Sequence, residues 1–121
     1  MKRFLYDSTT KSPGRLCGAD AQRSHSGKKL TEGMSQADFL EDSKTQDAVI
    51  MKLLVIGELA AQLLEEHNEF TGTHPEIPWH QMKGMRNRMA HGYFELNMDV
   101  VWDTVQLALP DLEANLRLIT R

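Results

Sequence analysis

The sequence predicts an all-α fold, an antiparallel helical bundle. Apolar residues recur at helical spacing in the segments 45–67 and 98–119, and no segment alternates as a strand would. N-cap residues, prolines and glycines bound these segments. With 121 residues, 40% of them hydrophobic, the chain can build one modest core. We therefore expect one helical domain over residues 30–121.

Residues 1–29 differ from the remainder. They are rich in Ser, Thr, Gly, Lys and Arg, and Pro13-Gly14 is a turn signal. Seven Lys/Arg against two Asp give this segment a charge of +5, so the other residues carry −8 of the net −3. A weak helix from Arg15 to Lys29 would bury little, and the basic residues are more typical of a solvated tail than of a nucleic-acid patch. We expect a poorly ordered leader, and hence a bundle whose first helix is degraded or missing.

Regular structure is expected from about Leu30. Ser35, followed by Asp38 in the first turn, is typical of an N-cap and predicts a short helix through Asp42. The strongest helix should cover residues 45–67, where the apolar face is wide. A face this wide suggests a central position with neighbours on more than one side.

Two residues inside this helix need an explanation. Gly57 costs about 1 kcal/mol relative to alanine, and close approach of another helix is the usual reason for a small residue. Glu58 is polar among apolar neighbours. It can be a buried acid with satisfied hydrogen bonds, a surface residue or a site residue, and the sequence leaves all three open.

The next helix should follow a loop at residues 71–75. Pro78 is suited to the first helical position, and the helix is expected to run to His91. Gly92 stands where a left-handed C-cap residue is wanted.

The last helix should begin after Asn97, a good N-cap, with Asp99 in its first turn. Pro110 lies inside the apolar pattern of this helix. Because proline lacks the N–H and its ring clashes with the preceding turn, we expect a kink or a break after Leu109.

Composition bears on location. Cys17 is the single cysteine, so no internal disulfide can form, which fits a reducing compartment. The sequence lacks an apolar run of about 20 residues and the apolar core of a signal peptide. We expect a cytoplasmic protein without a membrane partner.

Arg86 and His91 are the residues best suited to chemistry. Arginine binds phosphate oxygens with a planar fork of donors, and histidine moves protons near neutral pH. Such a pair could cleave an RNA phosphodiester without a metal, because the 2′-hydroxyl can serve as the nucleophile. Five residues apart on a helix, however, they point about 140° away from each other. One chain does not easily aim both at one ligand, whereas a groove shared by two chains could.

Neighbouring residues could assist. Asn87 could fix a phosphate oxygen or orient the imidazole, and Arg88 could bind a nearby backbone phosphate. The alternative is structural: a histidine near a helix C-terminus often only caps carbonyls, and a helical arginine often only makes a surface ion pair.

The histidines do not predict a metal site. His67, His74 and His80 lack a zinc-ligand spacing. Neither a metal nor a cofactor is expected.

The segment from about Leu30 to Arg121 resembles the HEPN superfamily, and in particular the HepT-like ribonuclease toxins. The hallmark R-x4-H-x-Y is present as Arg86, His91 and Tyr93, with Asn87 as the polar residue after the arginine. Flanking stretches match in order: Phe39-Leu40-Glu41-Asp42, Thr45-Gln46-Asp47-Ala48-Val49-Ile50, Ile56-Gly57-Glu58, His74-Pro75-Glu76-Ile77-Pro78-Trp79 and Val101-Trp102-Asp103-Thr104-Val105.

The resemblance implies a homodimer that brings two such motifs to one cleft. It implies metal-independent RNA cleavage with Arg86 and His91 catalytic, in a toxin–antitoxin system similar to type VII. The implied partner is a minimal nucleotidyltransferase antitoxin that can transfer AMP to Tyr93. That transfer would place bulk and negative charge where the RNA phosphate must sit.

Residues 1–29 depart from the family pattern, because members normally open with an amphipathic helix. The leader looks like foreign or frame-shifted sequence joined just before Leu30, and a bundle lacking one helix would expose apolar surface. Two alternatives to an active toxin follow: a non-catalytic module for dimerisation or partner binding, and a truncated remnant that folds poorly.

Overall fold

All regular structure in the described part of the chain is helical, as predicted. The structure, a computed structural model, describes residues 11–92 and 95–120. Its elements in chain order are α1 (Pro13–Lys29), α2 (Gln36–Leu40), α3 (Ser43–Glu66), α4 (Asn68–Gly72), α5 (Trp79–His91), α6 (Met98–Asp103), the π-helical segment η2 (Thr104–Ala108) and α7 (Leu109–Ile119).

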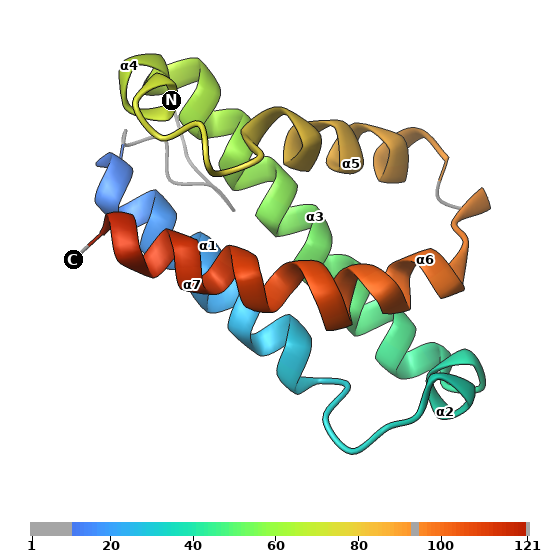
Figure 1. Cartoon of the computed structure of the whole chain (residues 1–121). Helices are drawn as coiled ribbons and strands as arrows, with labels where there is room; N and C mark the ends of the chain where they lie inside the picture. Colours follow the sequence, from blue (N-terminus) through green and yellow to red (C-terminus); the bar gives the residue numbers. More distant parts are fainter. Residues whose placement is uncertain (1–10, 93–94, 121) are drawn as a thin grey trace, which may run out of the picture.

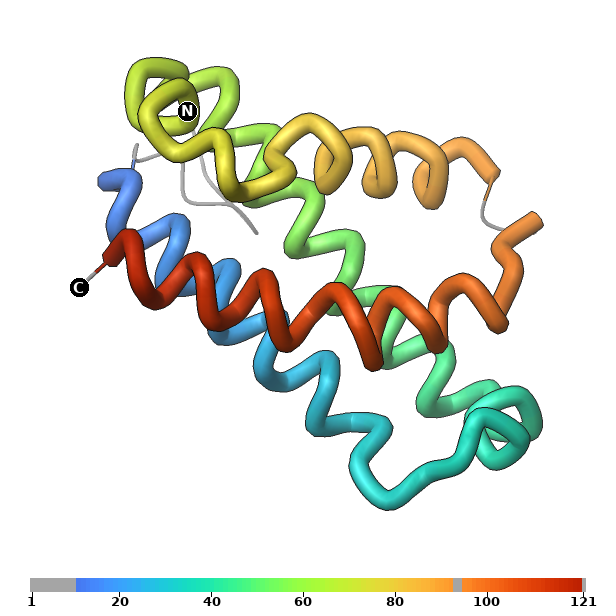
Figure 2. Tube along the Cα trace, viewed as in Figure 1, coloured from blue at the N-terminus to red at the C-terminus, as the bar shows by residue number. Residues whose placement is uncertain are grey.

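The long helices run in alternating directions along the chain, which makes an antiparallel bundle (Figure 1). Helix α3 is central, packing against α1 and α5, and α1 also packs against α7. Helices α5 and α7 do not pack closely against each other, and they lie apart in Figure 2. The C-terminal half of α5 faces apolar residues of α6, η2 and α7.

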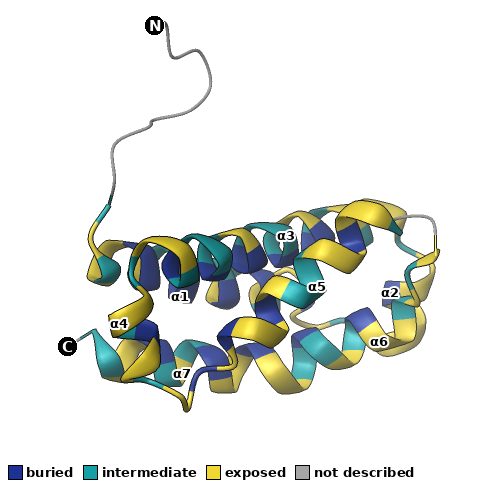
Figure 3. Ribbon diagram, turned by 90° about the horizontal axis from the view of Figure 1, so that it is seen from above, coloured by how far each residue is buried: buried dark blue, intermediate teal, exposed yellow. Residues whose placement is uncertain are grey.

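The wide apolar face of α3 is buried, as predicted for a central helix. Buried residues follow its length, and Figure 3 shows that they are turned towards the neighbouring helices. They are Val49, Ile50, Leu53, Ile56, Gly57, Ala60 and Leu63.

The expected poorly ordered leader and missing first helix are wrong for Pro13–Lys29, which form α1. Ser12 caps this helix, its Oγ accepting from the Arg15 N–H at 3.2 Å. The buried face includes small side chains, among them Ala21 and Gly27, and these give no strong apolar period. Small residues let α1 lie close to its neighbours: a Cβ at Gly27 would stand 3.0 Å from Leu109 Cδ1. Residues 1–10 lie outside the described part of the chain.

Helix α1 contains a buried carboxylic acid, Asp20, whose burial in the charged form would destabilise the folded state. Asp20 is 0% exposed, and neither carboxyl oxygen has a hydrogen-bond partner in the structure. Burial raises the pKa of Asp20 from 3.8 to about 8, because the charged form loses its hydration. The folded protein therefore holds a proton at neutral pH that the unfolded chain releases.

We predict that the free energy of unfolding falls as the pH rises from about 4 to about 8, by up to about 1.4 kcal/mol per pH unit from Asp20 alone. In this window the folded state binds more protons than the unfolded state, so raising the pH favours unfolding. Asp20→Asn cannot ionise and should remove this part of the slope. Urea denaturation at pH 5 and pH 7.5 measures it. Equal slopes in the two proteins would show that Asp20 ionises normally in the folded state.

The predicted N-caps are confirmed. Ser35 and Asp38 form a reciprocal capping box, each side chain accepting from the other's backbone N–H at 3.1 Å. The Asn97 side chain accepts from the Asp99 N–H at 2.9 Å, at the start of α6. Helix α3 begins two residues earlier than expected, because Asp42 accepts from the Thr45 N–H at 3.0 Å.

Two local expectations are wrong. The predicted loop at residues 71–75 begins too early, since Asn68–Gly72 form a short helix, α4. Gly92 does end α5, but its φ of −134° is not left-handed. Its N–H donates to the Arg88 carbonyl at 2.8 Å, so the last turn closes without a left-handed residue. Among the described residues, only Gly33, after α1, has a positive φ.

Pro110 does not break the helical run from Met98 to Ile119, although it lies within it. The π-helical segment η2 precedes it, and the Leu109 N–H donates to the Thr104 carbonyl, five residues back. Pro110 then lies at the start of α7, where its missing N–H is tolerated. The wider turn offers a physical reason why α6, η2 and α7 follow one another without a loop.

None of the helices in residues 11–92 and 95–120 is long and apolar enough to cross a membrane.

Candidate active site at the C-terminal end of α5

The sequence-predicted residues lie on the last two turns of α5. Arg88 and His91 belong to its final turn, where the positive charge of Arg88 complements the helix dipole. Asn87 and His91 are exposed. Tyr93, the expected AMP acceptor, lies outside the described residues.

Arg86 faces the central helix. Its Nη1 donates to Glu58 Oε1 at 2.6 Å, and its side chain is only 24% exposed. Its Nε is buried and has no hydrogen-bond partner in the structure. Of the three interpretations left open for Glu58, a buried acid is excluded, because its side chain is 63% exposed. Glu58 is a surface residue that pairs with the predicted catalytic arginine.

Gly57 brings Arg86 close to α3, which confirms the prediction of a close helix contact. A Cβ at position 57 would overlap the Arg86 Cβ and would stand 2.7 Å from the Met82 carbonyl oxygen. Real Cβ atoms essentially never approach other atoms so closely. Because position 57 has no side chain, the backbone of Arg86 can lie directly against α3.

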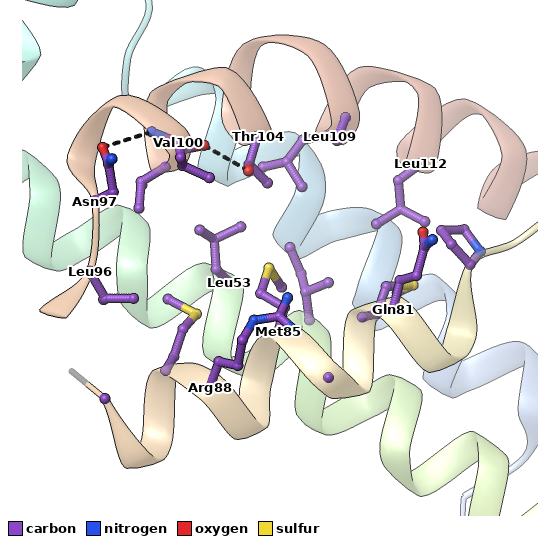
Figure 4. Close-up of a pocket in the computed structure, with 18 of the residues that line it drawn as sticks. Leu53, Gln81, Met85, Arg88, Leu96, Asn97, Val100, Thr104, Leu109 and Leu112 are labelled. Carbon is purple, nitrogen blue, oxygen red and sulfur yellow. Dashed lines mark hydrogen bonds between the residues drawn. The ribbon is translucent and has the colours of Figure 1, made fainter.

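A groove of about 1200 Å³ separates α5 from α6, η2 and α7. We call it the α5–α7 groove; its apolar lining includes Leu53, Met82, Met85, Met89, Leu96, Val100, Val101, Leu109 and Leu112. Arg88 and His91 also line it, whereas Arg86 and Asn87 do not. Figure 4 shows Arg88 extending from α5 into the space between the two walls. In the part of the chain that the structure describes, neither the Arg88 side chain nor the His91 side chain makes a hydrogen bond or an ion pair.

The structure therefore divides the predicted site residues. It brings Arg88 and His91 to one groove and turns Arg86 towards α3, as the angular separation on one helix requires. Residues on the opposite wall, such as Val100 and Thr104, were not predicted to face the motif. The sequence carries no signal for them, because their position depends on how α6 and η2 return past α5.

The side chains of Arg88 and His91, at the end of α5, are of the types that bind anions and transfer protons. An imidazole with no described partner can accept or deliver a proton, and unpaired guanidinium N–H groups can bind phosphate oxygens. Within the described residues, no group of three or more His, Cys, Asp or Glu side chains could hold a metal ion.

Comparison with known proteins decides the family. The model of a family described as "Ribonuclease HepT-like" matches residues 24–119, which include all of α5. The chain belongs to the HepT-like ribonuclease family. The resemblance found in the sequence is thereby confirmed.

Individual relatives of this chain also carry names of ribonucleases. A protein of Thermococcus cleftensis named "Probable ribonuclease HepT" is 41% identical over 85 residues, covering 70% of this chain and 74% of its own. A Methanocaldococcus jannaschii protein named as a candidate RNase is 40% identical over 82 residues, or 68% of this chain and 65% of its own. A Caldanaerobacter subterraneus protein with a similar name is 33% identical, covering 71% and 74%. No solved structure gives a significant match.

Proposed function

We propose that this chain is a metal-independent endoribonuclease in which Arg86 and His91 are catalytic. The observation that carries the proposal is the exposed end of α5. There a HepT-like chain presents an unpartnered histidine and an unpartnered arginine, Arg88, at one groove, with Arg86 one turn away. Proton transfer by a positioned histidine contributes about 10²–10⁴-fold to such reactions.

In the proposed reaction the 2′-hydroxyl of RNA attacks the adjacent phosphorus. The O2′–P bond forms, the P–O5′ bond breaks, and the products are a 2′,3′-cyclic phosphate and a free 5′-hydroxyl. Histidine accepts the 2′-hydroxyl proton or donates a proton to the leaving 5′-oxygen. Arg86 stabilises the extra negative charge of the pentacoordinate transition state. Asn87 and Arg88 bind neighbouring phosphate oxygens.

The active form is proposed to be a homodimer. Arg86 and His91 of one chain are directed to different sides of α5, so a site that uses both is completed by a second copy. The open, apolar α5–α7 groove leaves surface near His91 for such an association.

Regulation is proposed to come from a minimal nucleotidyltransferase antitoxin of a type VII-like pair, acting in the cytoplasm. Tyr93 follows His91 by two residues. AMP on its hydroxyl would add a negative phosphate close to the catalytic histidine, repelling the RNA backbone.

The test is cleavage of RNA by purified protein in EDTA. Product ends with 2′,3′-cyclic phosphate and 5′-hydroxyl are expected, since no metal-bound water takes part. Loss of cleavage in EDTA, restored by a divalent cation, would contradict the metal-independent reaction. Absence of cleavage under all conditions, with binding to the partner retained, would favour the alternative of a non-catalytic module.

A further inference from the structure

Among the described residues of the R-x4-H motif, Arg86 is the one whose side chain forms an ion pair, with Glu58. The distance of 2.6 Å between Arg86 Nη1 and Glu58 Oε1 is that of a strong, charge-assisted hydrogen bond. Exposed ion pairs of this kind stabilise a fold little, and Glu58 is largely exposed. Stabilisation of the fold is therefore too small an effect to explain the pair. Because Arg86 is the predicted catalytic arginine, the pair can instead act by fixing the orientation of its guanidinium group.

The arginine is fixed at both ends. At its base, the contact with Gly57 holds the Arg86 backbone and Cβ against α3. At its tip, Glu58 binds one Nη atom. A long, flexible side chain is thus restricted in conformation, and its remaining Nη donors keep a defined direction. Between the two ends, the buried Nε has no acceptor in the structure, so the side chain is not arranged to satisfy all of its own donors.

We propose that Glu58 is a positioning residue for Arg86, orienting the guanidinium so that its free donors meet the phosphate in the transition state. This inference rests on the proposed ribonuclease function. It adds a role for α3, an element that the R-x4-H motif does not include. Glu58 acts through Arg86 and does not itself touch the substrate.

The decisive variant is Glu58→Gln, which keeps the length of the side chain and removes its charge. We expect kcat to fall about 10- to 100-fold, with KM little changed, because misplacing a catalytic group by a small distance has effects of this size. Glu58→Asp, whose carboxylate is retracted by one methylene, should retain more activity than Glu58→Ala. The thermal midpoint should stay that of the wild type, because Glu58 is exposed.

Glu65→Gln is the matched control. Glu65 is an exposed glutamate of the same helix that makes no described hydrogen bond or ion pair, so its variant should keep the wild-type kcat. A fall in kcat of equal size in both variants would overturn the inference, because it would show that the effect does not depend on contact with Arg86. Unchanged kcat in Glu58→Gln would overturn it as well.

Nitrogen NMR of the Arg86 side chain tests the same point without RNA. In the wild type, the two Nη signals should be distinct, because the Glu58 hydrogen bond slows rotation of the guanidinium; in Glu58→Gln they should merge. Identical Arg86 spectra in the two proteins would overturn the inference. If the wild type does not cleave RNA, the proposed function fails, while these spectra still show whether Glu58 orients Arg86.

Discussion

Replacement of His91 by alanine is expected to lower RNA cleavage by about 10²- to 10⁴-fold, the usual contribution of a general acid or base. The fold should survive, because His91 is an exposed residue at the end of α5 without a described hydrogen bond. Circular dichroism and thermal unfolding should therefore be those of the wild type. The measurement is single-turnover cleavage of a short labelled RNA.

His80→Ala is the control for this loss. His80 is also exposed, also lies on α5 and also lines the α5–α7 groove, but it stands near the opposite end of the helix. Its variant should cleave RNA normally. If His91→Ala cleaves as fast as the wild type, the catalytic assignment is wrong.

Mixing two inactive variants tests the shared site. In a mixed dimer of Arg86→Ala and His91→Ala chains, one composite site regains both an arginine and a histidine. Cleavage should therefore reappear on mixing. If each chain uses its own pair, the mixture should stay inactive.

Gly57→Ala is expected to destabilise the protein by about 3 kcal/mol or more, the upper end of the cost of overpacking a core. The added methyl group would meet the Arg86 Cβ and the Met82 carbonyl oxygen. Neither atom is the far end of a flexible side chain, so α3 and α5 must move apart. Urea denaturation measures the loss, and RNA cleavage should fall with it because Arg86 is displaced.

Gly18→Ala is expected to raise the free energy of unfolding, in contrast to Gly57→Ala. Gly18 lies within α1, and a Cβ there would meet no atom within 4 Å. Alanine should therefore stabilise the helix by about 0.5–1 kcal/mol, because glycine is the more flexible residue in the unfolded chain. A Gly57→Ala protein as stable as the wild type would contradict the close contact between α3 and α5.

Local signals predicted much of the fold. The wide apolar face of α3 and the caps at Ser35 and Asn97 depend on side chains within a turn or two of each other. The sequence alone is therefore enough to predict them. The end of α5 at His91 was predicted in the same way, although the conformation of Gly92 was not.

The remainder depends on contacts between distant segments. Helix α1 was missed because its buried face includes Asp20, Ser24 and Gly27, which do not look like a core until α3 and α7 are in place. The partner of Arg86 was missed because Glu58 lies on another helix. Periodicity marks which residues share a face of one helix, but it does not say which helix that face will meet.

The π-helical segment has a consequence for the length of the chain. A π turn holds one residue more than an α turn, and each residue of an α-helix rotates the next by about 100°. Because the wider turn takes up one additional residue, Val101 before it and Leu109 after it both face the core. Deleting one residue from Thr104–Ala108 should therefore leave a regular α-helix in which both residues stay buried. A deletion within α7 should instead rotate the residues on its two sides by about 100° relative to each other, and turn part of the groove wall away from α5.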